Sequence, residues 1–196
     1  DESRETYERL RDILNQEQWP YWLVPGNHDD PLLMREVFST HVTQDIPGMS
    51  FCAVLEDVVV MGLDTHEPGS AGGRLSAASL EWFNQQCIKH RGHSILVFMH
   101  HPPLNTGDDF FDSIGLAERE SFWDNIKRYP QIKAVGFGHL HRPLPLHHEP
   151  WVHGAPSAAF SMEKTKDGWD VQPEGAGYLV WSVSERDVKI EVLGRG

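Results

Sequence analysis

The 196-residue chain contains only two cysteines, Cys52 and Cys87, which lie far apart in apolar surroundings. Two cysteines exclude the disulfide frameworks that stabilise small secreted domains. A single disulfide would account for both, but two free thiols in a reducing compartment is the interpretation that we favour. On this ground we expect a cytoplasmic protein.

Long hydrophobic runs and an excess of basic residues are also missing. No stretch approaches the roughly 20 apolar residues of a membrane span, so no membrane association is expected. The 29 acidic residues outnumber the 17 basic ones and give a net charge of −12, which disfavours a nucleic acid polymer as partner. A small phosphorylated substrate stays compatible with this charge, because bound cations can reverse the local field.

The spacing of apolar residues predicts alternating helices and strands, followed by a β-rich end. This order predicts one α/β domain over residues 1–196, with residues 143–196 as a mostly β tail. We interpret the polar stretch at 164–177 as a mobile loop. Helices are predicted around residues 7–14 and 122–126, and two more are predicted to begin at residues 31 and 77. Strands are predicted at residues 21–24, 51–55, 58–63, 95–99, 132–137, 178–183 and 188–193.

Five histidines and one asparagine follow directly on three of the predicted strands. Because ligand sites in open α/β sheets gather beyond the carboxyl ends of the strands, we expect these side chains to converge. Imidazole suits first-row divalent ions, and an amide oxygen adds a ligand without adding charge. The pattern therefore predicts a metal site. Its candidate residues are Asn27, His28, His100, His101, His139 and His141.

The pair His139 and His141 also predicts a local geometry. Residues two apart in extended backbone point to the same side, and Gly138 gives the turn freedom to splay them. Two imidazoles placed in this way can serve one ion or two neighbouring ions.

Three blocks of the sequence resemble those of the calcineurin-like metallophosphoesterase superfamily. The resemblance covers nearly the whole chain and is closest to the class III cyclic nucleotide phosphodiesterases and the related glycerophosphodiesterases. It implies a layered α-β-β-α sandwich, here incomplete at its N-terminus. The three blocks are Pro25-Gly-Asn27-His28-Asp29, Met99-His-His-Pro-Pro103 and Gly138-His-Leu-His141, and further similarity lies at Gly73-Arg-Leu-Ser76, Asp112-Ser-Ile-Gly115 and Pro173-Glu-Gly-Ala-Gly-Tyr178.

By this resemblance, the protein is a binuclear enzyme that hydrolyses cyclic nucleotides or similar small phosphodiesters through attack of a metal-activated water. Asn27, His100 and His139 would bind one ion. His141 would bind the other ion, and iron, manganese and zinc all suit these ligands. Similar enzymes often dimerise, so a homodimer is a candidate assembly.

The substrate side of the implied site involves two more residues. His28 would face the phosphate, where it stabilises charge or protonates the leaving oxygen. Arg142 is a candidate phosphate contact, and a surface salt bridge is the alternative. We interpret His101 as a residue that supports the metal ligands from behind or that packs in the core. Asp64 either orients a ligand or caps a loop.

The superfamily pattern begins with Asp-x-His and Gly-Asp blocks, and neither precedes Asn27 in this sequence. The abrupt, helical first residues, which lack a starting Met, indicate an internal start. We therefore expect the 196-residue chain by itself to be inactive or nearly so. A non-catalytic binding or scaffold protein and a phosphomonoesterase are the alternative functions.

Overall fold

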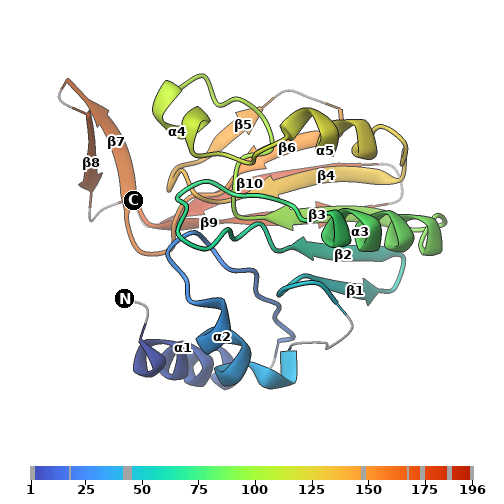
Figure 1. The fold of residues 1–196 in the computed structure, drawn as a ribbon, viewed down its shortest axis with the longest axis horizontal. Helices are drawn as coiled ribbons and strands as arrows, with labels where there is room; N and C mark the ends of the chain where they lie inside the picture. The colour runs from blue at the N-terminus through green and yellow to red at the C-terminus, as the bar shows by residue number, and fades with distance from the viewer. Residues whose placement is uncertain are drawn as a thin grey trace.

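A six-stranded sheet forms the centre of the computed structural model, which describes residues 3–17, 19–41, 46–146, 149–166, 168–172, 175–184 and 187–194 (Figure 1). Its helices are α1 (Arg4–Gln16), α2 (Pro31–Val37), α3 (Ala77–Lys89), α4 (Asp109–Ser113) and α5 (Arg119–Ile126), with a 3-10 helix η1 (Ser39–His41). The strands are β1 (Phe51–Leu55), β2 (Val58–Leu63), β3 (Ser94–Met99), β4 (Ile132–Phe137), β5 (Leu144–Leu146), β6 (Trp151–Gly154), β7 (Ser161–Thr165), β8 (Gly168–Gln172), β9 (Gly177–Val183) and β10 (Val188–Gly194).

The central sheet has the strand order β1-β2-β3-β4-β6-β5. Its four middle strands are parallel, and β1 and β5 run antiparallel at the two edges. The middle strands are almost wholly apolar, because strands covered on both faces expose no side to water. Since parallel strands end at the same edge, the loops after β2, β3 and β4 meet there (Figure 1).

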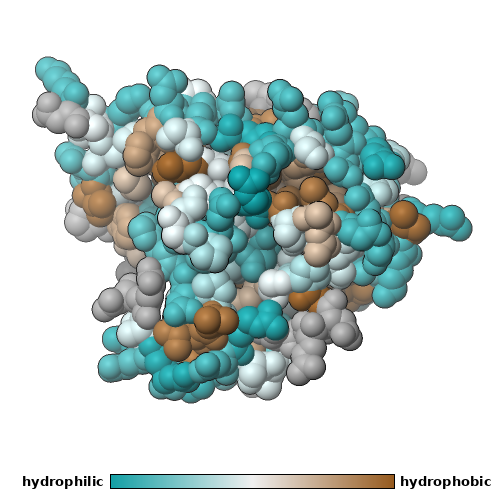
Figure 2. Space-filling model, viewed as in Figure 1, coloured by the Kyte–Doolittle hydropathy of each residue, from teal (hydrophilic) through white to brown (hydrophobic). Residues whose placement is uncertain are grey.

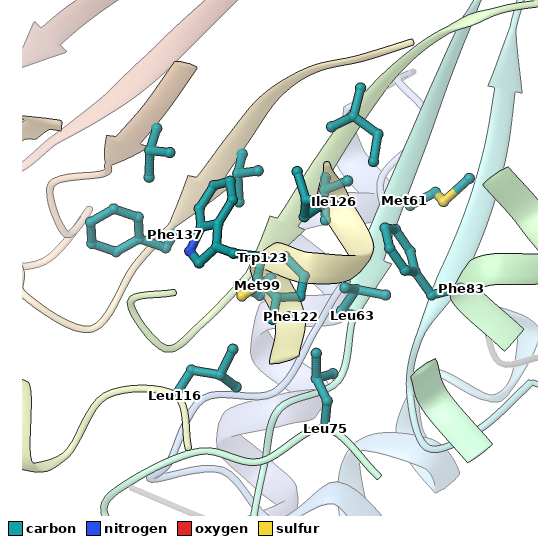
Figure 3. Close-up of a cluster of buried hydrophobic side chains, with 14 of the residues drawn as sticks. Met61, Leu63, Leu75, Phe83, Met99, Leu116, Phe122, Trp123, Ile126 and Phe137 are labelled. Carbon is teal, nitrogen blue, oxygen red and sulfur yellow. The ribbon is translucent and has the colours of Figure 1, made fainter. Parts of the chain in front are cut away.

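One face of the sheet is covered by α3 and α5. The rings of Phe83 in α3 and Phe122 in α5 lie 6.3 Å apart, so the two helices share one core. Figure 3 shows Phe122, Trp123 and Ile126 of α5 among side chains of the sheet. The predicted start of α3 is confirmed, because the Ser76 side chain accepts a hydrogen bond of 3.0 Å from the Ser79 backbone N–H.

The hairpin of β9 and β10 packs on the opposite face of the sheet. The Trp181 ring of β9 meets the Phe98 ring of β3 edge to face at 5.3 Å. A Cβ on Gly136 of β4 would lie 3.1 Å from the same indole, so the absence of a side chain there makes room for it. The sheet is therefore enclosed between helices and strands, and the predicted layered α/β class is confirmed.

Helices α1 and α2 form a second, smaller hydrophobic cluster beside the main core (Figure 1). Tyr7 is the one described residue of α1 that is buried, whereas Ile13 is 52% exposed. In Figure 2 an apolar patch lies over α2, where Leu32 is 73% exposed. Among the described residues, no helix combines the length and the apolar character needed to cross a bilayer.

The strand predicted at 21–24 is wrong. This segment is extended, but no neighbouring strand forms a ladder with it among the described residues. It packs through its side chains instead: the ring of Trp22 lies 5.9 Å from that of Phe51, and Val24 sits against Gly62 of β2. A strand needs backbone partners, and periodicity along the chain does not report whether a partner lies alongside.

The loop predicted at 164–177 is wrong in its first half. Strands β7 and β8 pair there as an antiparallel hairpin, with Lys164 opposite Trp169 and Met162 opposite Val171. The many polar residues mislead because this hairpin is exposed on much of its surface, so an apolar alternation is not required of it.

Candidate metal centre

Three side chains from distant parts of the chain converge beyond the carboxyl ends of β3 and β4. The Asn27 Oδ1 lies 2.9 Å from the His100 Nε2 and 3.2 Å from the His139 Nδ1, and the two imidazole nitrogens are 3.0 Å apart. One oxygen and two nitrogens thus form a triangle with sides near 3 Å. Of the six candidate ligands that the sequence predicts, these three are brought into direct contact.

The loop that carries Asn27 is held by polar contacts on both sides. The Asp29 carboxylate accepts hydrogen bonds from the Gly26 N–H at 2.8 Å and from the Tyr7 hydroxyl at 3.0 Å. The same Tyr7 oxygen accepts the Asp30 N–H at 2.8 Å. Asp30 in turn caps α2, as predicted. The turn is therefore fixed by α1 and α2 rather than by a sheet.

A glycine is required where this loop meets β3. A Cβ on Gly26 would lie 2.8 Å from the Cε1 of His100, closer than carbon atoms approach in real structures. The hydrogen at this position lets the His100 ring reach Asn27. This packing explains the glycine in the Pro-Gly-Asn27-His28 block.

The clustered imidazoles are held in their neutral form. Burial lowers the pKa of His139 to about 3, and repulsion from His101, His141 and His28 adds to the effect. The pKa of His100 is likewise lowered far below its usual value, first by burial and then by its neighbours. A neutral imidazole has a free lone pair, which is the form that binds a metal ion.

His28 and His141 flank this triangle without a direct bond to it. His28 is exposed, and its charge lowers the pKa of His141, after burial as the larger cause. The His141 ring lies 4.4 Å from the Phe160 ring, and its Nδ1 is buried with no hydrogen-bond partner among the residues that the structure describes. A buried lone nitrogen beside the triangle is consistent with a position for a second ligand.

The extended backbone predicted for His139 and His141 is wrong. Both residues are left-handed, with φ angles of 70° and 53°. Between them Leu140 is completely buried, so the chain turns twice to place one apolar side chain in the core. Non-glycine residues in this region cost on the order of 1–3 kcal/mol, and such residues cluster at functional sites. The two residues therefore do not lie along an extended strand.

His101 lies behind the triangle and is fully buried. Its Nδ1 hydrogen-bonds the hydroxyl of Thr65 at 2.8 Å, and its ring centroid lies 5.0 Å from that of His139. A Cβ on Gly73 would lie 2.1 Å from the same Nδ1. Gly73 also exchanges backbone hydrogen bonds with residues 115 and 117. Two sequence blocks of the resemblance thus meet over one histidine.

Arg142 lies against an aromatic ring that the sequence did not point to. Its guanidinium carbon is 5.0 Å from the ring centroid of Trp169. Trp169 also contacts Phe111 at 4.8 Å, and Phe111 contacts His139 at 6.0 Å. Sequence reasoning missed Phe111, Phe160 and Trp169, because aromatic residues in short helices, loops and short strands have no motif spacing.

Three other polar residues, Asp64, Asp112 and His153, have local roles. Asp64 is a loop cap, since its carboxylate accepts the backbone N–H groups of Met49 and His66 at 2.8 and 2.9 Å. Asp112 accepts the backbone N–H and the hydroxyl of Thr106. The Nδ1 of His153 hydrogen-bonds the Gly154 carbonyl. His147 and His148 lie outside the described residues.

The donor set fits a metal ion of the first transition row. Nitrogen and oxygen ligands bind zinc at about 2.0–2.2 Å, so two ligands of one ion lie roughly 2.8–3.6 Å apart for angles at the ion between about 90° and 109°. The three observed separations of 2.9, 3.0 and 3.2 Å agree with that spacing. His100, His101 and His139 also offer three nitrogens within 4.8 Å of one another.

Fold and site together define an α/β domain whose histidine and asparagine side chains converge where the loops of a parallel sheet meet. Residues 1–143 match the family described as Calcineurin-like phosphoesterase. The chain belongs to this family.

Several curated proteins are similar in sequence to this chain. A probable cyclic nucleotide phosphodiesterase from Synechococcus sp. (strain WH7803) is 34% identical over 60% of the chain and 43% of its own length. A probable glycerophosphodiester phosphodiesterase from Arcobacter nitrofigilis is 29% identical over 71% of the chain and 52% of its own length. A 3',5'-cyclic-nucleotide phosphodiesterase from Nostoc sp. is 27% identical over 91% and 66%. The chain thus spans about half the length of the first of these relatives.

A solved structure supports the fold. The chain is similar to a dimetal phosphatase from Danio rerio with a TM-score of 0.68, covering 97% of this chain and 76% of that one. The sequence identity is 14%, so the likeness concerns the fold.

Proposed function

We propose that the protein is a metal-dependent phosphodiesterase that hydrolyses small phosphodiesters such as cyclic nucleotides. The observation that carries the proposal is the triangle of Asn27, His100 and His139 donor atoms with sides of 2.9 to 3.2 Å. The family supports a phosphoesterase, and relatives named as cyclic nucleotide phosphodiesterases support the substrate class.

In this proposal Asn27, His100 and His139 hold one ion, and His141 contributes to a second. Iron, manganese and zinc all suit imidazole and amide ligands. When bound, such ions supply Lewis acidity toward a phosphate and lower the pKa of a nearby water. The low pKa values of His100 and His139 keep their nitrogens unprotonated at neutral pH, so protons do not compete for the site.

His28 is the residue that we assign to the substrate. It is exposed, and it lies close enough to lower the pKa values of His100, His139 and His141 through its charge. A protonated imidazole at this place would stabilise the developing charge on the phosphate, or donate its proton to the departing oxygen.

The proposal is tested on full-length protein by metal analysis and by turnover of cyclic AMP and bis(p-nitrophenyl) phosphate with added manganese. We expect Asn27→Ala and His139→Ala to lose bound metal and turnover, and His28→Ala to keep metal and lose turnover. His90→Gln is the control, because His90 ends α3 at the opposite end of β3. Intact metal content and turnover in His139→Ala would refute the proposal. p-Nitrophenyl phosphate, a monoester, is assayed alongside. If it is hydrolysed faster than the two diesters, the protein is a phosphomonoesterase instead.

A further inference from the structure

Trp169 lies where three segments meet beside the candidate metal centre. Its ring contacts Phe111 of α4 at 4.8 Å, with an angle of 71° between the planes. The guanidinium carbon of Arg142, from the loop after β4, lies 5.0 Å from the ring centroid. The ammonium of Lys164, from the paired strand β7, lies at 5.9 Å. The indole therefore has two cations next to it.

The two cations differ in how their charge is balanced. Lys164 donates to the Asp108 carboxylate at 2.5 Å, and the Asp108 side chain is only 7% exposed. Arg142 has no ion pair with a carboxylate within the described part of the chain, and its Nε is buried without a hydrogen-bond partner. Several other described arginines also have no ion pair, so what distinguishes Arg142 is its contact with the indole and its place directly after His141.

The position of Arg142 gives this uncompensated charge a use. Arg142 directly follows His141 in the chain. A guanidinium presents a planar set of donors that matches two phosphate oxygens at once, and it stays charged at any physiological pH. A free arginine side chain would lose rotamer entropy on binding an anion, whereas one already held against an indole loses less. Tryptophan is the aromatic residue that holds cations best.

We propose that Trp169 is a positioning residue that holds the guanidinium of Arg142, the residue that follows His141, ready to bind an oxygen of the substrate phosphodiester. The proposal rests on the proposed function, because it assigns Arg142 to the same phosphate. The Lys164–Asp108 pair acts differently, since it fastens the β7–β8 hairpin to the start of α4 and thereby keeps Trp169 in place.

A double-mutant cycle on manganese-loaded, full-length protein tests this inference. Trp169→Ala, Arg142→Ala and the double variant are compared by isothermal titration of inorganic phosphate, by KM and kcat on bis(p-nitrophenyl) phosphate, and by metal content. We expect Trp169→Ala to weaken phosphate binding and to raise KM by roughly threefold to tenfold, with kcat and metal content unchanged. In the Arg142→Ala background, Trp169→Ala should not weaken phosphate binding further, because Trp169 acts on the phosphate through the Arg142 guanidinium.

Trp169→Phe serves as the conservative variant and should recover part of the affinity, since a smaller ring still attracts a cation. Trp19→Ala is the matched control, because Trp19 is 78% exposed and lies in the N-terminal part after α1. The inference is overturned if Trp169→Ala leaves phosphate affinity unchanged, or if its effect multiplies with that of Arg142→Ala. Loss of metal from Trp169→Ala would overturn it too, because the effect would then run through Phe111 and His139. A wild-type protein without turnover refutes the proposed function, whereas the cycle of phosphate affinities decides the role of Trp169.

Discussion

The hydroxyl of Tyr7 donates a hydrogen bond of 3.0 Å to Asp29, two residues after Asn27. The same oxygen accepts the Asp30 N–H, so one phenol joins α1 to the turn that carries a candidate metal ligand. Burial raises the pKa of Tyr7 to about 12, so the hydroxyl stays protonated and able to donate. The first helix thus supports the site although it contributes no ligand.

We expect Tyr7→Phe to lower the free energy of unfolding by about 1–3 kcal/mol, because the partly buried Asp29 and Asp30 groups lose a partner. Metal affinity should fall with it, since the Asn27 turn loses one of its supports. Chemical denaturation and metal titration measure both effects. Tyr21→Phe is the matched control: its hydroxyl bonds Asn15 at the exposed surface, so little change is expected. Equal effects of the two substitutions would contradict this role of Tyr7.

Gly26→Ala should displace His100. The new methyl group would lie 2.8 Å from the His100 Cε1, and an aromatic ring does not yield as a flexible chain end does. We expect a loss of stability of about 1–3 kcal/mol and roughly tenfold weaker metal binding, measured by denaturation and by metal titration. Gly92→Ala, where no atom lies within 4 Å of the added carbon, should behave like wild type. Wild-type metal affinity in Gly26→Ala would mean that the loop shifts freely.

The stability of the metal-free protein should fall as the pH drops below 6.5. Burial lowers the pKa of the fully buried His101 to about 4, so between pH 6.5 and 4 the unfolded chain binds more protons than the folded one. The free energy of unfolding then decreases with falling pH, by on the order of 3 kcal/mol at pH 4. Urea unfolding at pH 7, 6 and 5 measures the slope.

His101→Gln identifies the source of that slope. A glutamine does not titrate, so the variant should show a flatter dependence of stability on pH, whatever its stability at pH 7. The pKa of His139, lowered to about 3, acts in the same direction and leaves a residual slope. An unchanged slope in His101→Gln would show that this histidine is not the group responsible.

Asp108→Asn should loosen the β7–β8 hairpin. Asparagine still caps α4, but it lacks the charge that pairs with Lys164. We expect faster hydrogen exchange in residues 161–166 and 168–172, with a loss of global stability of about 1 kcal/mol. Asp124→Asn is the control, because its pair with Lys127 is 3.4 Å long and exposed on both sides, and such pairs contribute little. Unchanged exchange in the hairpin would show that the cross-strand contacts alone hold it.

Much of the site could be read from the chain because its residues stand directly after apolar strands. Apolar runs such as 95–99 and 132–137 form parallel strands in most contexts, and parallel strands end at one edge, so His100 and His139 had to approach each other. The Gly26 and Gly73 positions also belong to short blocks whose spacing is visible. Their purpose, which is to leave room for His100 and His101, appears only in space.

The sequence by itself determined the type and order of most elements, since hydrophobic periodicity and helix caps act over a few residues. The tertiary structure decided which segments find a partner and which conformation the ligand loops adopt. Residues 21–24 pack without a ladder, β7 and β8 pair where polarity indicated a loop, and His139 and His141 turn left-handed so that Leu140 can be buried. These outcomes depend on contacts between residues far apart in the chain. The free energy of such contacts outweighs the local conformational preferences of the residues, and the contacts produce no periodic pattern in the sequence.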